Sequence, residues 1–424
     1  MTHNPIITKV ANNCDALSQW LVMAGHTNIL AVADENTSPF AKEIIGNLST
    51  AQLLTLSPTP GNQDLVPDET AIGKIFIAAA PYQANPASSA LLAVGSGTIG
   101  DLVRYVSSRL GLTYYIVATA ASMDGYTSTV TAPMVDGLKQ TYPADAAAGV
   151  IAVPAIFETA PGILTAAGFG DIMGKYTSVV DWEMEGRIYP QADDFCQDLA
   201  NEMRKITEDC FNAKTPASIM DALIDSGLVM QKAGHSRPAA GAEHHLSHFW
   251  EMMALMKGHT PALHGAKVGM ATLAVLQAQE WLLEENITEE IWAKAEEAAV
   301  SFDASAWKEE LRRLYAHATD EVLALWPDET PETRLALVKA MQENWGSLRI
   351  ILSQNVGLKP KIKSAIADMG GPVTPQELEV CRDTFVAGVL HANRLRRRFS
   401  TMRMLDLLGL LPQYAERLAA QFFV

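Results

Sequence analysis

An excess of histidine in one short segment is the first feature of this sequence that could support chemistry. Six of its ten histidines lie between residues 235 and 264. His244 and His248 are four residues apart, a spacing that puts two side chains on one face of a helix. Neutral imidazole is the commonest metal ligand among side chains, so the segment predicts a metal or catalytic site. Any single histidine could still be an ordinary core or surface residue. The six are His235, His244, His245, His248, His259 and His264.

A carboxylate is needed to complete such a metal site, and Asp171 is the candidate. It lies in the segment GFGDIMGK at residues 168–175, where strand-like sequence gives way to helical sequence. An Asp that follows a Gly also suits the N-cap of a helix. Spacing alone leaves both interpretations open.

A glycine-rich segment, GSGTIGD at residues 95–101, follows an apolar run and precedes a helical one. Glycine lets the backbone approach a ligand closely, and unpaired N–H groups at a helix start bind a pyrophosphate. The segment could equally be only a turn, and it is not the dinucleotide fingerprint after a first strand. Asp34, at the end of an earlier apolar run, could bond an adenosine ribose or simply close a turn.

The elements that must position these residues divide the chain in two. Before about residue 160, short and continuous apolar runs alternate with helical stretches at 39–47 and 99–110, as in a mostly parallel sheet buried on both faces. Later residues have helical spacing instead, as at 193–210, 266–283, 331–352 and 375–387. We therefore predict an α/β dinucleotide-binding domain over 1–160 and an all-helical domain over 161–424 that binds metal and substrate. The strand-like runs are at 28–33, 53–56, 90–94, 114–118 and 148–153.

The bulk composition excludes some functions. A formal net charge of -16 argues against nucleic acid as a partner. No run reaches the length of a membrane span, and the first residues lack a secretory pattern, so we expect a cytoplasmic protein. Its scattered cysteines, without a CxxC pair, are expected to be reduced thiols. They are Cys14, Cys196, Cys210 and Cys381.

Several motifs, in their order along the chain, resemble the sn-glycerol-1-phosphate dehydrogenase family, and its bacterial branch most. That family belongs to a larger group with glycerol dehydrogenase, iron-type alcohol dehydrogenases and dehydroquinate synthase. The resemblance runs from about residue 25 to the C-terminus, and TAASMDGY is its most specific motif. The motifs are GTIGD at 97–101, TAASMDGYTS at 119–128, Gly170–Asp171, GAEHHLSH at 241–248 and His264–Gly265.

The resemblance implies a reaction and a set of site residues. Family members convert dihydroxyacetone phosphate to sn-glycerol 1-phosphate with NADH or NADPH and a divalent metal. It implies that Asp171, His244 and His264 hold zinc, nickel or iron, and that Asp124, His248 and Asp171 contact the substrate. The extra His245 and the Gly-Ser-Gly form of the loop depart from the pattern. The residues matching those that line the dinucleotide are Asp34, Gly97, Thr98, Ile99, Gly100, Asp101, Thr119, Ser122 and Ser128.

The chemistry of ketone reduction suits these residues. A three-ligand cation keeps positions open for a carbonyl oxygen and stabilises the developing negative charge. His248 could bond the substrate and pass a proton, and Asp124 could bond a substrate hydroxyl. Asp34 weakly favours NADH, because its charge would repel a 2′-phosphate.

The phosphate-binding group is open at this point. Arg237 is one candidate and Lys175 another, although each could be an ordinary surface or helix-end charge. The basic run at 394–398 is by default a solvated helical face, and otherwise an intersubunit or substrate contact.

Two other functions stay open. One is a dehydrogenase for glycerol or another polyol or alcohol, without a phosphate. The other is a non-catalytic sensor or structural partner on the same fold, which the complete set of Asp171, His244 and His264 argues against. We also expect a homo-oligomer.

Overall fold

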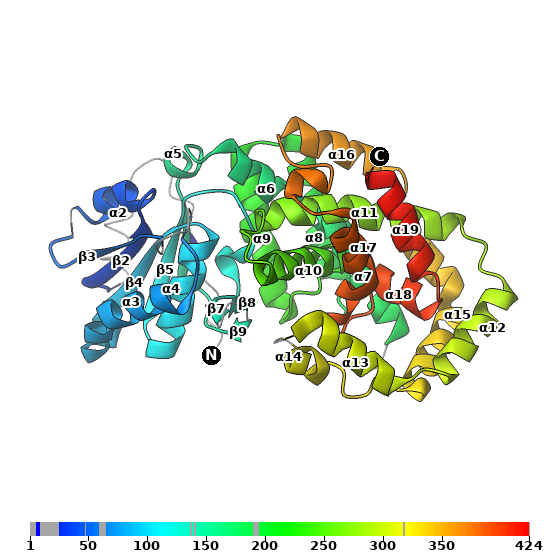
Figure 1. Ribbon diagram of the computed structural model, residues 1–424. Helices are drawn as coiled ribbons and strands as arrows, with labels where there is room; N and C mark the ends of the chain where they lie inside the picture. The colour runs from blue at the N-terminus through cyan, green and yellow to red at the C-terminus, as the bar shows by residue number, and fades with distance from the viewer. Residues whose placement is uncertain are drawn as a thin grey trace. The chain divides into compact units, whose positions relative to one another are not determined.

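The computed structural model describes residues 6–8, 25–46, 48–58, 65–135, 138–139, 141–189, 195–316 and 319–423. The chain forms two compact units (Figure 1). The first joins Met1–Ile172 to Asn212–Gln231, and the second joins Met173–Phe211 to Lys232–Val424. These units are not divided by a single boundary after residue 160, because a later segment returns to the first unit. The predicted functional domains, 1–160 and 161–424, stay a prediction.

A parallel sheet of six strands forms the centre of the first unit. Its order is β1-β10-β5-β4-β2-β3, and every neighbouring pair is parallel. The five predicted strands are confirmed, and the short edge strand β1 adds to them. The strands are β1 (Ile6–Thr8), β2 (Asn28–Asp34), β3 (Gln52–Leu56), β4 (Ser89–Gly95), β5 (Thr113–Ala118) and β10 (Gly149–Ala152).

Helices cover both faces of this sheet, which explains its unbroken apolar runs. On one face, α2 (Ser38–Ile45) packs Ala41 and Ile44 against Ile29, Ala31 and Ala33 of β2. On the other face lie α3 (Glu69–Ala79) and α4 (Gly97–Leu110), which contact β2 and are drawn in front of the sheet in Figure 1. All seven residues of β4 are buried.

The strand order reverses next to β2, and this reversal locates a ligand-binding edge. The chain passes from β2 outward to β3, then crosses back to place β4 on the other side of β2. In open α/β sheets, ligands bind beyond the carboxyl ends of the strands at such a switch point. Asp34 ends β2 and Gly95 ends β4, so the predicted cofactor residues flank this position.

The rest of the first unit consists of short elements and three helices. Helix α6 carries Asp171, and α9 belongs to this unit up to Gln231. The elements are η1 (Ala80–Ala84), η2 (Pro86–Ser88), η3 (Gly125–Thr127), β6 (Val130–Thr131) paired with β9 (Tyr142–Pro143), β7 (Met134–Val135) paired with β8 (Leu138–Lys139), α5 (Pro154–Phe157), α6 (Gly162–Met173) and α9 (Pro216–Ala233).

The described residues of the second unit form helices and the loops that connect them, without a strand, as predicted. Its longest helices, α11 and α15, pack against each other, and α11 is mostly buried. The elements are α7 (Lys175–Ile188), α8 (Gln197–Ala213), α10 (Ala242–Met256), α11 (His264–Glu284), α12 (Glu289–Val300), α13 (Ala304–Tyr315), α14 (Thr319–Ala324), α15 (Pro331–Ser353), α16 (Leu358–Asp368), η5 (Gln376–Leu378), α17 (Arg382–His391), η6 (Ala392–Arg394), α18 (Thr401–Leu407) and α19 (Leu411–Phe422).

One predicted helix is wrong in its extent. The stretch 375–387 is not continuous, because η5 ends and a new helix, α17, begins only at Arg382. Glu379 adopts a φ of 58°, a left-handed conformation that a right-handed helix cannot contain. The predicted stretch 193–210 falls partly on residues 193 and 194, which lie outside the described residues, as Cys14 does.

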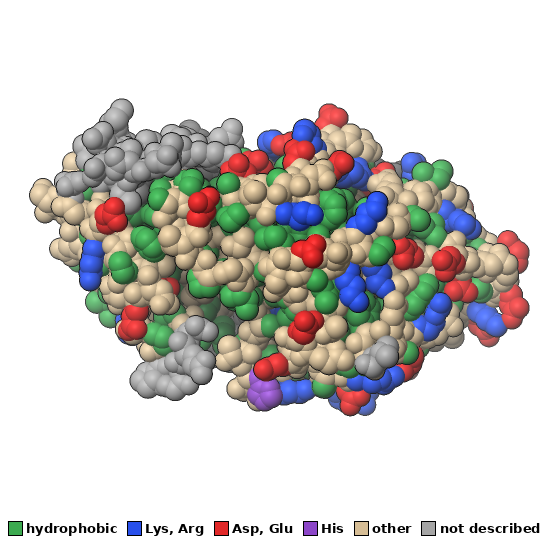
Figure 2. Space-filling model, turned by 90° about the horizontal axis from the view of Figure 1, so that it is seen from above, with side chains coloured by type: hydrophobic (Ala, Val, Ile, Leu, Met, Phe, Trp, Pro, Cys, Tyr) green, Lys and Arg blue, Asp and Glu red, His purple; other side chains and the backbone are tan. Residues whose placement is uncertain are grey.

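The surface mixes charges of both signs. On the face drawn in Figure 2, Lys and Arg side chains alternate with Asp and Glu side chains and do not gather into one patch. Within the described part of the chain, no helix is both long and apolar enough to cross a membrane.

Glycine at position 168 lets α6 approach the loop that follows β5. A Cβ atom at this position would lie 2.1 Å from the carbonyl oxygen of Ala121, far inside van der Waals contact. The carbonyl of Ala121 belongs to the backbone, which cannot move aside as the end of a flexible side chain could. This close approach fixes the loop at 119–124 against α6.

We therefore expect Gly168→Ala to destabilise the protein by about 1–3 kcal/mol or more, because backbone must shift to admit the methyl group. Gly73→Ala is the matched control. It lies within α3 with open space around its position, and we expect about 0.5–1 kcal/mol of stabilisation. Chemical denaturation of the two variants measures both changes. Equal stability of the two variants would contradict this packing.

Candidate metal and cofactor site

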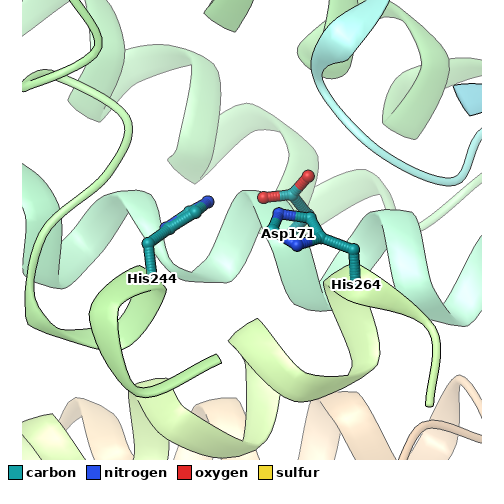
Figure 3. Close-up of side chains that lie close together, drawn as sticks. All are labelled: Asp171, His244 and His264. Atoms are coloured by element: carbon teal, nitrogen blue, oxygen red, sulfur yellow. The ribbon is translucent and has the colours of Figure 1, made fainter. Parts of the chain in front are cut away.

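Three side chains, from Asp171, His244 and His264, point toward one another (Figure 3). Each offers one ligand atom, a carboxylate oxygen or a ring nitrogen, and these atoms all lie within 4.8 Å of one another. Asp171 and His244 are buried, and His264 is partly exposed. The residues predicted as metal ligands therefore come together, from α6, α10 and α11.

Both histidines lie at the start of a helix. His244 lies in the first turn of α10, and His264 is the first residue of α11. The positive end of a helix dipole disfavours an added positive charge, and a histidine binds a metal through the lone pair of a ring nitrogen. The partial positive charge at these helix starts also repels a bound cation, so acidic groups nearby must offset this repulsion.

Asp171 is the first of these acidic groups. It is fully buried near the end of α6, which begins at Gly162, so the interpretation as an N-cap residue is wrong. Its Oδ2 accepts a hydrogen bond of 3.0 Å from the backbone N–H of Asp124. The Asp124 carboxylate in turn accepts one of 3.2 Å from the hydroxyl of Ser226 on α9. The loop after β5 therefore orients the Asp171 carboxylate.

Glu243 is a second acidic group, which the sequence analysis missed. Its Oε1 lies 2.8 Å from Nδ1 of His244 and accepts a bond of 2.7 Å from the N–H of Gly241. Its Oε2 accepts a bond of 2.7 Å from Thr177. Burial opposes ionisation, but these hydrogen bonds and His244 lower the pKa of Glu243. A carboxylate on Nδ1 leaves Nε2 of His244 as the ligand atom.

The signal for Glu243 was its position in the motif GAEHHLSH, directly before a proposed ligand. A carboxylate there can reach the first ring nitrogen of the next residue. Asp181 holds the residue before Glu243, because its Oδ2 accepts a 2.8 Å hydrogen bond from the N–H of Ala242. Burial and the Glu243 charge raise the pKa of Asp181 to about 7.

The six clustered histidines separate into two groups. The rings of His244, His248 and His264 are neighbours, with centroids 5.3 to 6.0 Å apart. His248 is partly exposed, and burial together with the charges of His264 and Arg396 lowers its pKa well below 6.5. The other three lie elsewhere: His235 packs edge-on against Trp182, His245 is buried, and His259 is exposed.

The predicted dinucleotide residues lie along the carboxyl ends of β2, β4 and β5. The N–H of Thr119 bonds the carbonyl of Gly95 at 3.2 Å, and the hydroxyl of Ser122 lies 2.5 Å from that of Ser96. Ser96 precedes α4 without capping it through its side chain. The first N–H groups of α4 therefore have no side-chain cap from Ser96, the arrangement that suits a pyrophosphate.

Asp34 closes a turn, as the simpler interpretation expected. Its Oδ1 accepts bonds from the N–H and the hydroxyl of Thr37, at 2.8 and 2.9 Å. A carboxylate has a second oxygen, so this turn is compatible with a bond to a ribose hydroxyl.

Several of the remaining predicted dinucleotide residues make contacts within the protein. Ile99 packs on Gly95, where a Cβ would lie 2.5 Å away, and Gly100 lies against Ile116. Asp101 forms an ion pair with Arg104, and Thr98 lies in the first turn of α4. The hydroxyl of Ser128 bonds the carbonyl of Val130 at 2.9 Å, within the loop after η3.

Arg104 is a buried residue that the sequence analysis missed, although its i, i+3 spacing from Asp101 was visible. It donates to Asp101 at 2.7 Å, to the hydroxyl of Tyr114 at 2.8 Å and to the carbonyl of Val130 at 3.1 Å. It also donates to the carbonyl of Gly125. One guanidinium thus joins the start of α4 to the loop at 125–130.

Two candidates for phosphate binding are engaged within the second unit. Lys175 is fully buried and donates to the carbonyl of Ala239 at 3.1 Å. Arg237 forms an ion pair of 3.0 Å with Glu185.

The basic run at 394–398 is not a solvated helical face, so that default interpretation is wrong. It leaves η6 and continues as irregular backbone before α18. Arg394 pairs with Glu310 at 2.6 Å, and only Arg397 is exposed. Burial lowers the pKa of Arg396, and lowers that of Arg398 to about 10.

A family model described as iron-containing alcohol dehydrogenase matches residues 10–161. This match covers the parallel sheet except for its edge strand β1, and it includes the glycine-rich turn. Together with the relatives below, it indicates the class of NAD(P)-dependent, metal-containing dehydrogenases.

A curated relative from Halalkalibacterium halodurans, named glycerol-1-phosphate dehydrogenase [NAD(P)+], is 36% identical over 278 residues, covering 62% of this chain and 68% of the relative. A second relative of the same name, from Geobacillus thermodenitrificans, is 29% identical and covers 91% of this chain and 88% of its own. The chain belongs to the glycerol-1-phosphate dehydrogenase family.

The fold is shared more widely. A solved structure of a probable glycerol dehydrogenase from Sinorhizobium meliloti 1021 superposes with a TM-score of 0.58 at 15% identity, covering 97% of this chain and 98% of that one. The predicted fold class, an α/β region with a mostly parallel sheet followed by a helical part, is confirmed.

We expect Arg104→Met to destabilise the protein by about 3–5 kcal/mol, because it leaves Asp101 and two carbonyl groups without their buried partner. We also expect weaker NADH binding, since the loop at 125–130 loses its connection to α4. Arg109→Met, an exposed position on the same helix, is the control. Denaturation and NADH fluorescence titration measure the two effects. Unchanged NADH affinity in Arg104→Met would contradict the role in cofactor binding.

Proposed function

We propose that this protein catalyses the reversible, NAD(P)H-linked reduction of dihydroxyacetone phosphate to sn-glycerol 1-phosphate. We further propose that Asp171, His244 and His264 hold its divalent metal. The observation that carries the proposal is the set of three ligand atoms within 4.8 Å of one another, in a chain of this family.

The donor set fits a catalytic metal. One carboxylate oxygen and two imidazole nitrogens suit zinc, nickel or iron, and three protein ligands leave positions open for a substrate. When bound, the metal supplies polarisation of the ketone and the nicotinamide supplies the hydride.

The protein's own groups bind the substrate and move a proton. Asp124 is buried beside Asp171, to which its N–H is bonded, so its carboxylate is positioned to accept a hydrogen bond from a substrate hydroxyl. His248, whose ring centroid lies 5.5 Å from that of His264, would hydrogen-bond the oxygen that becomes an alcohol and pass it a proton. Wild-type turnover in a His248→Ala enzyme would exclude this role.

The cofactor would lie at the switch point of the sheet. The first turn of α4 faces the pyrophosphate, with Gly97 and Thr98 offering backbone N–H groups. The second carboxylate oxygen of Asp34 would accept a hydrogen bond from a hydroxyl of the adenosine ribose. The negative charge of Asp34 would repel a 2′-phosphate at that position and so favours NADH over NADPH. Ser122 and Thr119 line the same edge.

The expected homo-oligomer, the cytoplasmic location and the absence of a nucleic-acid partner stay predictions. The basis for the last is the net charge of -16.

Metal analysis paired with a substrate comparison tests the proposed function. We expect the purified protein to contain about one divalent ion per chain and to oxidise NADH with dihydroxyacetone phosphate. Chelation should abolish the activity, and added metal should restore it, because Asp171, His244 and His264 cannot polarise a ketone without a bound cation. A preference for plain dihydroxyacetone would indicate a polyol dehydrogenase instead. No oxidation of NADH or NADPH with any ketone, metal present, would favour a non-catalytic protein.

Replacement of Glu243 tests how His244 is held. We expect Glu243→Gln to weaken metal affinity about 10- to 100-fold, because the carboxylate that orients the ring and raises its basicity is lost. Glu251→Gln, on the same helix, breaks an ion pair with Lys267 and should reduce stability while leaving metal affinity near wild type. Competition with a chelating dye measures affinity. Equal affinity in Glu243→Gln and wild type would show that Glu243 does not position this ligand.

A further inference from the structure

The side chain of Met123 lies between two glycines at the predicted cofactor edge of the sheet. Gly97 is the first residue of α4, and Gly125 is the first residue of η3. A Cβ atom added at Gly97 would lie 2.4 Å from Sδ of Met123, and one added at Gly125 would lie 2.3 Å from its Cε. The end of this one side chain therefore fills the space that both glycines leave open.

Backbone conformation does not explain these two glycines. Neither Gly97 nor Gly125 has the positive φ that favours glycine, as Gly111 at the end of α4 does. Glycine also serves where another group must come close to the backbone. In this structure the group that comes close is the thioether of Met123.

The space that Met123 fills adjoins the place expected to receive the cofactor. Gly97 and Thr98 begin α4, and the proposed function assigns their backbone N–H groups to the pyrophosphate of the dinucleotide. Met123 and Gly97 line one small pocket, with Ser96 and Tyr126 among its other walls. A ligand that approaches Gly97 from the side where a Cβ would lie meets the sulfur of Met123 first.

The main chain on both sides of Met123 is held by hydrogen bonds. The hydroxyl of Ser122 lies 2.5 Å from that of Ser96. The N–H of Asp124 donates to Asp171 at 3.0 Å. Met123 itself is partly exposed, and a methionine side chain is unbranched and has three rotatable bonds. Rotation about these bonds can therefore clear the start of α4 while the residues on either side stay in place.

We infer that the side chain of Met123 covers the start of α4 and is displaced by the dinucleotide that binds there. The inference rests on the proposed function for the place of the cofactor. Met123 then sets cofactor affinity, because binding must first move its thioether away from Gly97 and Gly125. A variant without this side chain should bind the same cofactor more tightly.

Truncation of Met123 tests this effect on affinity. For Met123→Ala, we expect NADH and ADP-ribose to bind about 3- to 10-fold more tightly, because no side chain has to leave Gly97 first. Met123→Leu keeps the volume of the side chain and should not gain this affinity. Met134→Ala, at a partly buried methionine on β7, is the matched control and should bind as the wild type does. Fluorescence titration with NADH and calorimetric titration with ADP-ribose measure these affinities.

An NMR measurement follows the side chain itself and needs no turnover. In protein with ¹³C-labelled methionine methyl groups, the signal of Met123 is the one that is absent from Met123→Leu. Its methyl protons should show a nuclear Overhauser effect to the α-protons of Gly125, because Cε lies against that glycine. This effect should disappear when ADP-ribose is added, because the methyl group then leaves its position.

Two results would overturn the inference and leave the proposed cofactor site standing. One is unchanged or weaker binding of NADH and ADP-ribose by Met123→Ala, which would mean that the side chain does not compete with them. The other is a nuclear Overhauser effect to Gly125 that persists at saturating ADP-ribose. If Met123→Ala does not fold, the NMR measurement on the wild type decides. Failure of the wild type and of both Met123 variants to bind NADH or ADP-ribose would overturn the proposed cofactor site, and the inference with it.

Discussion

A carboxylate that must stay charged without solvent is the constraint on which this site depends. Asp171 is fully buried, and a buried charge is tolerated only when hydrogen bonds or opposite charges compensate it. The N–H of Asp124 supplies one such bond, which requires the loop after β5 to lie against α6. Gly168, one turn earlier on α6, permits that approach by leaving room for the carbonyl of Ala121. The absence of a side chain at Gly168 and the buried charge of Asp171 therefore both depend on the contact between α6 and the loop after β5.

The histidine side of the site follows a similar logic. Two helix starts hold His244 and His264, and a helix start is a poor place for added positive charge. Glu243, fixed by Gly241, Thr177 and His244, adds a buried negative charge there. The protein thus builds its site from compensating charges, and each charge is held by backbone or by a short side chain whose geometry is fixed.

Sequence reasoning succeeded where a pattern is local and failed where the outcome depends on packing. The strands were predictable because a sheet covered on both faces needs unbroken apolar runs, as β4 shows. The grouping of Asp171 with His244 and His264 was expected from a family resemblance, since spacing alone left Asp171 open to an N-cap role. The break at Glu379 was not predictable, because a left-handed residue that is not Gly leaves no signal in composition. Glu243 and Arg104 were missed, and the basic run at 394–398 was left open, because a charged residue is expected at the surface until its partners are known.

The return of the chain to the first unit in α9 has a consequence for biosynthesis. The hydroxyl of Ser226 bonds Asp124, and the carbonyl of Ile224 accepts from Thr127, so the loop after β5 is completed by residues made well after the sheet. As the protein leaves the ribosome, the sheet can form while this loop still lacks its supports. The loop reaches its final state only after α7 and α8, which belong to the other unit, have also emerged. Maturation of the site is therefore a late event, and a nascent chain halted before α9 would carry a finished sheet with an unfinished loop.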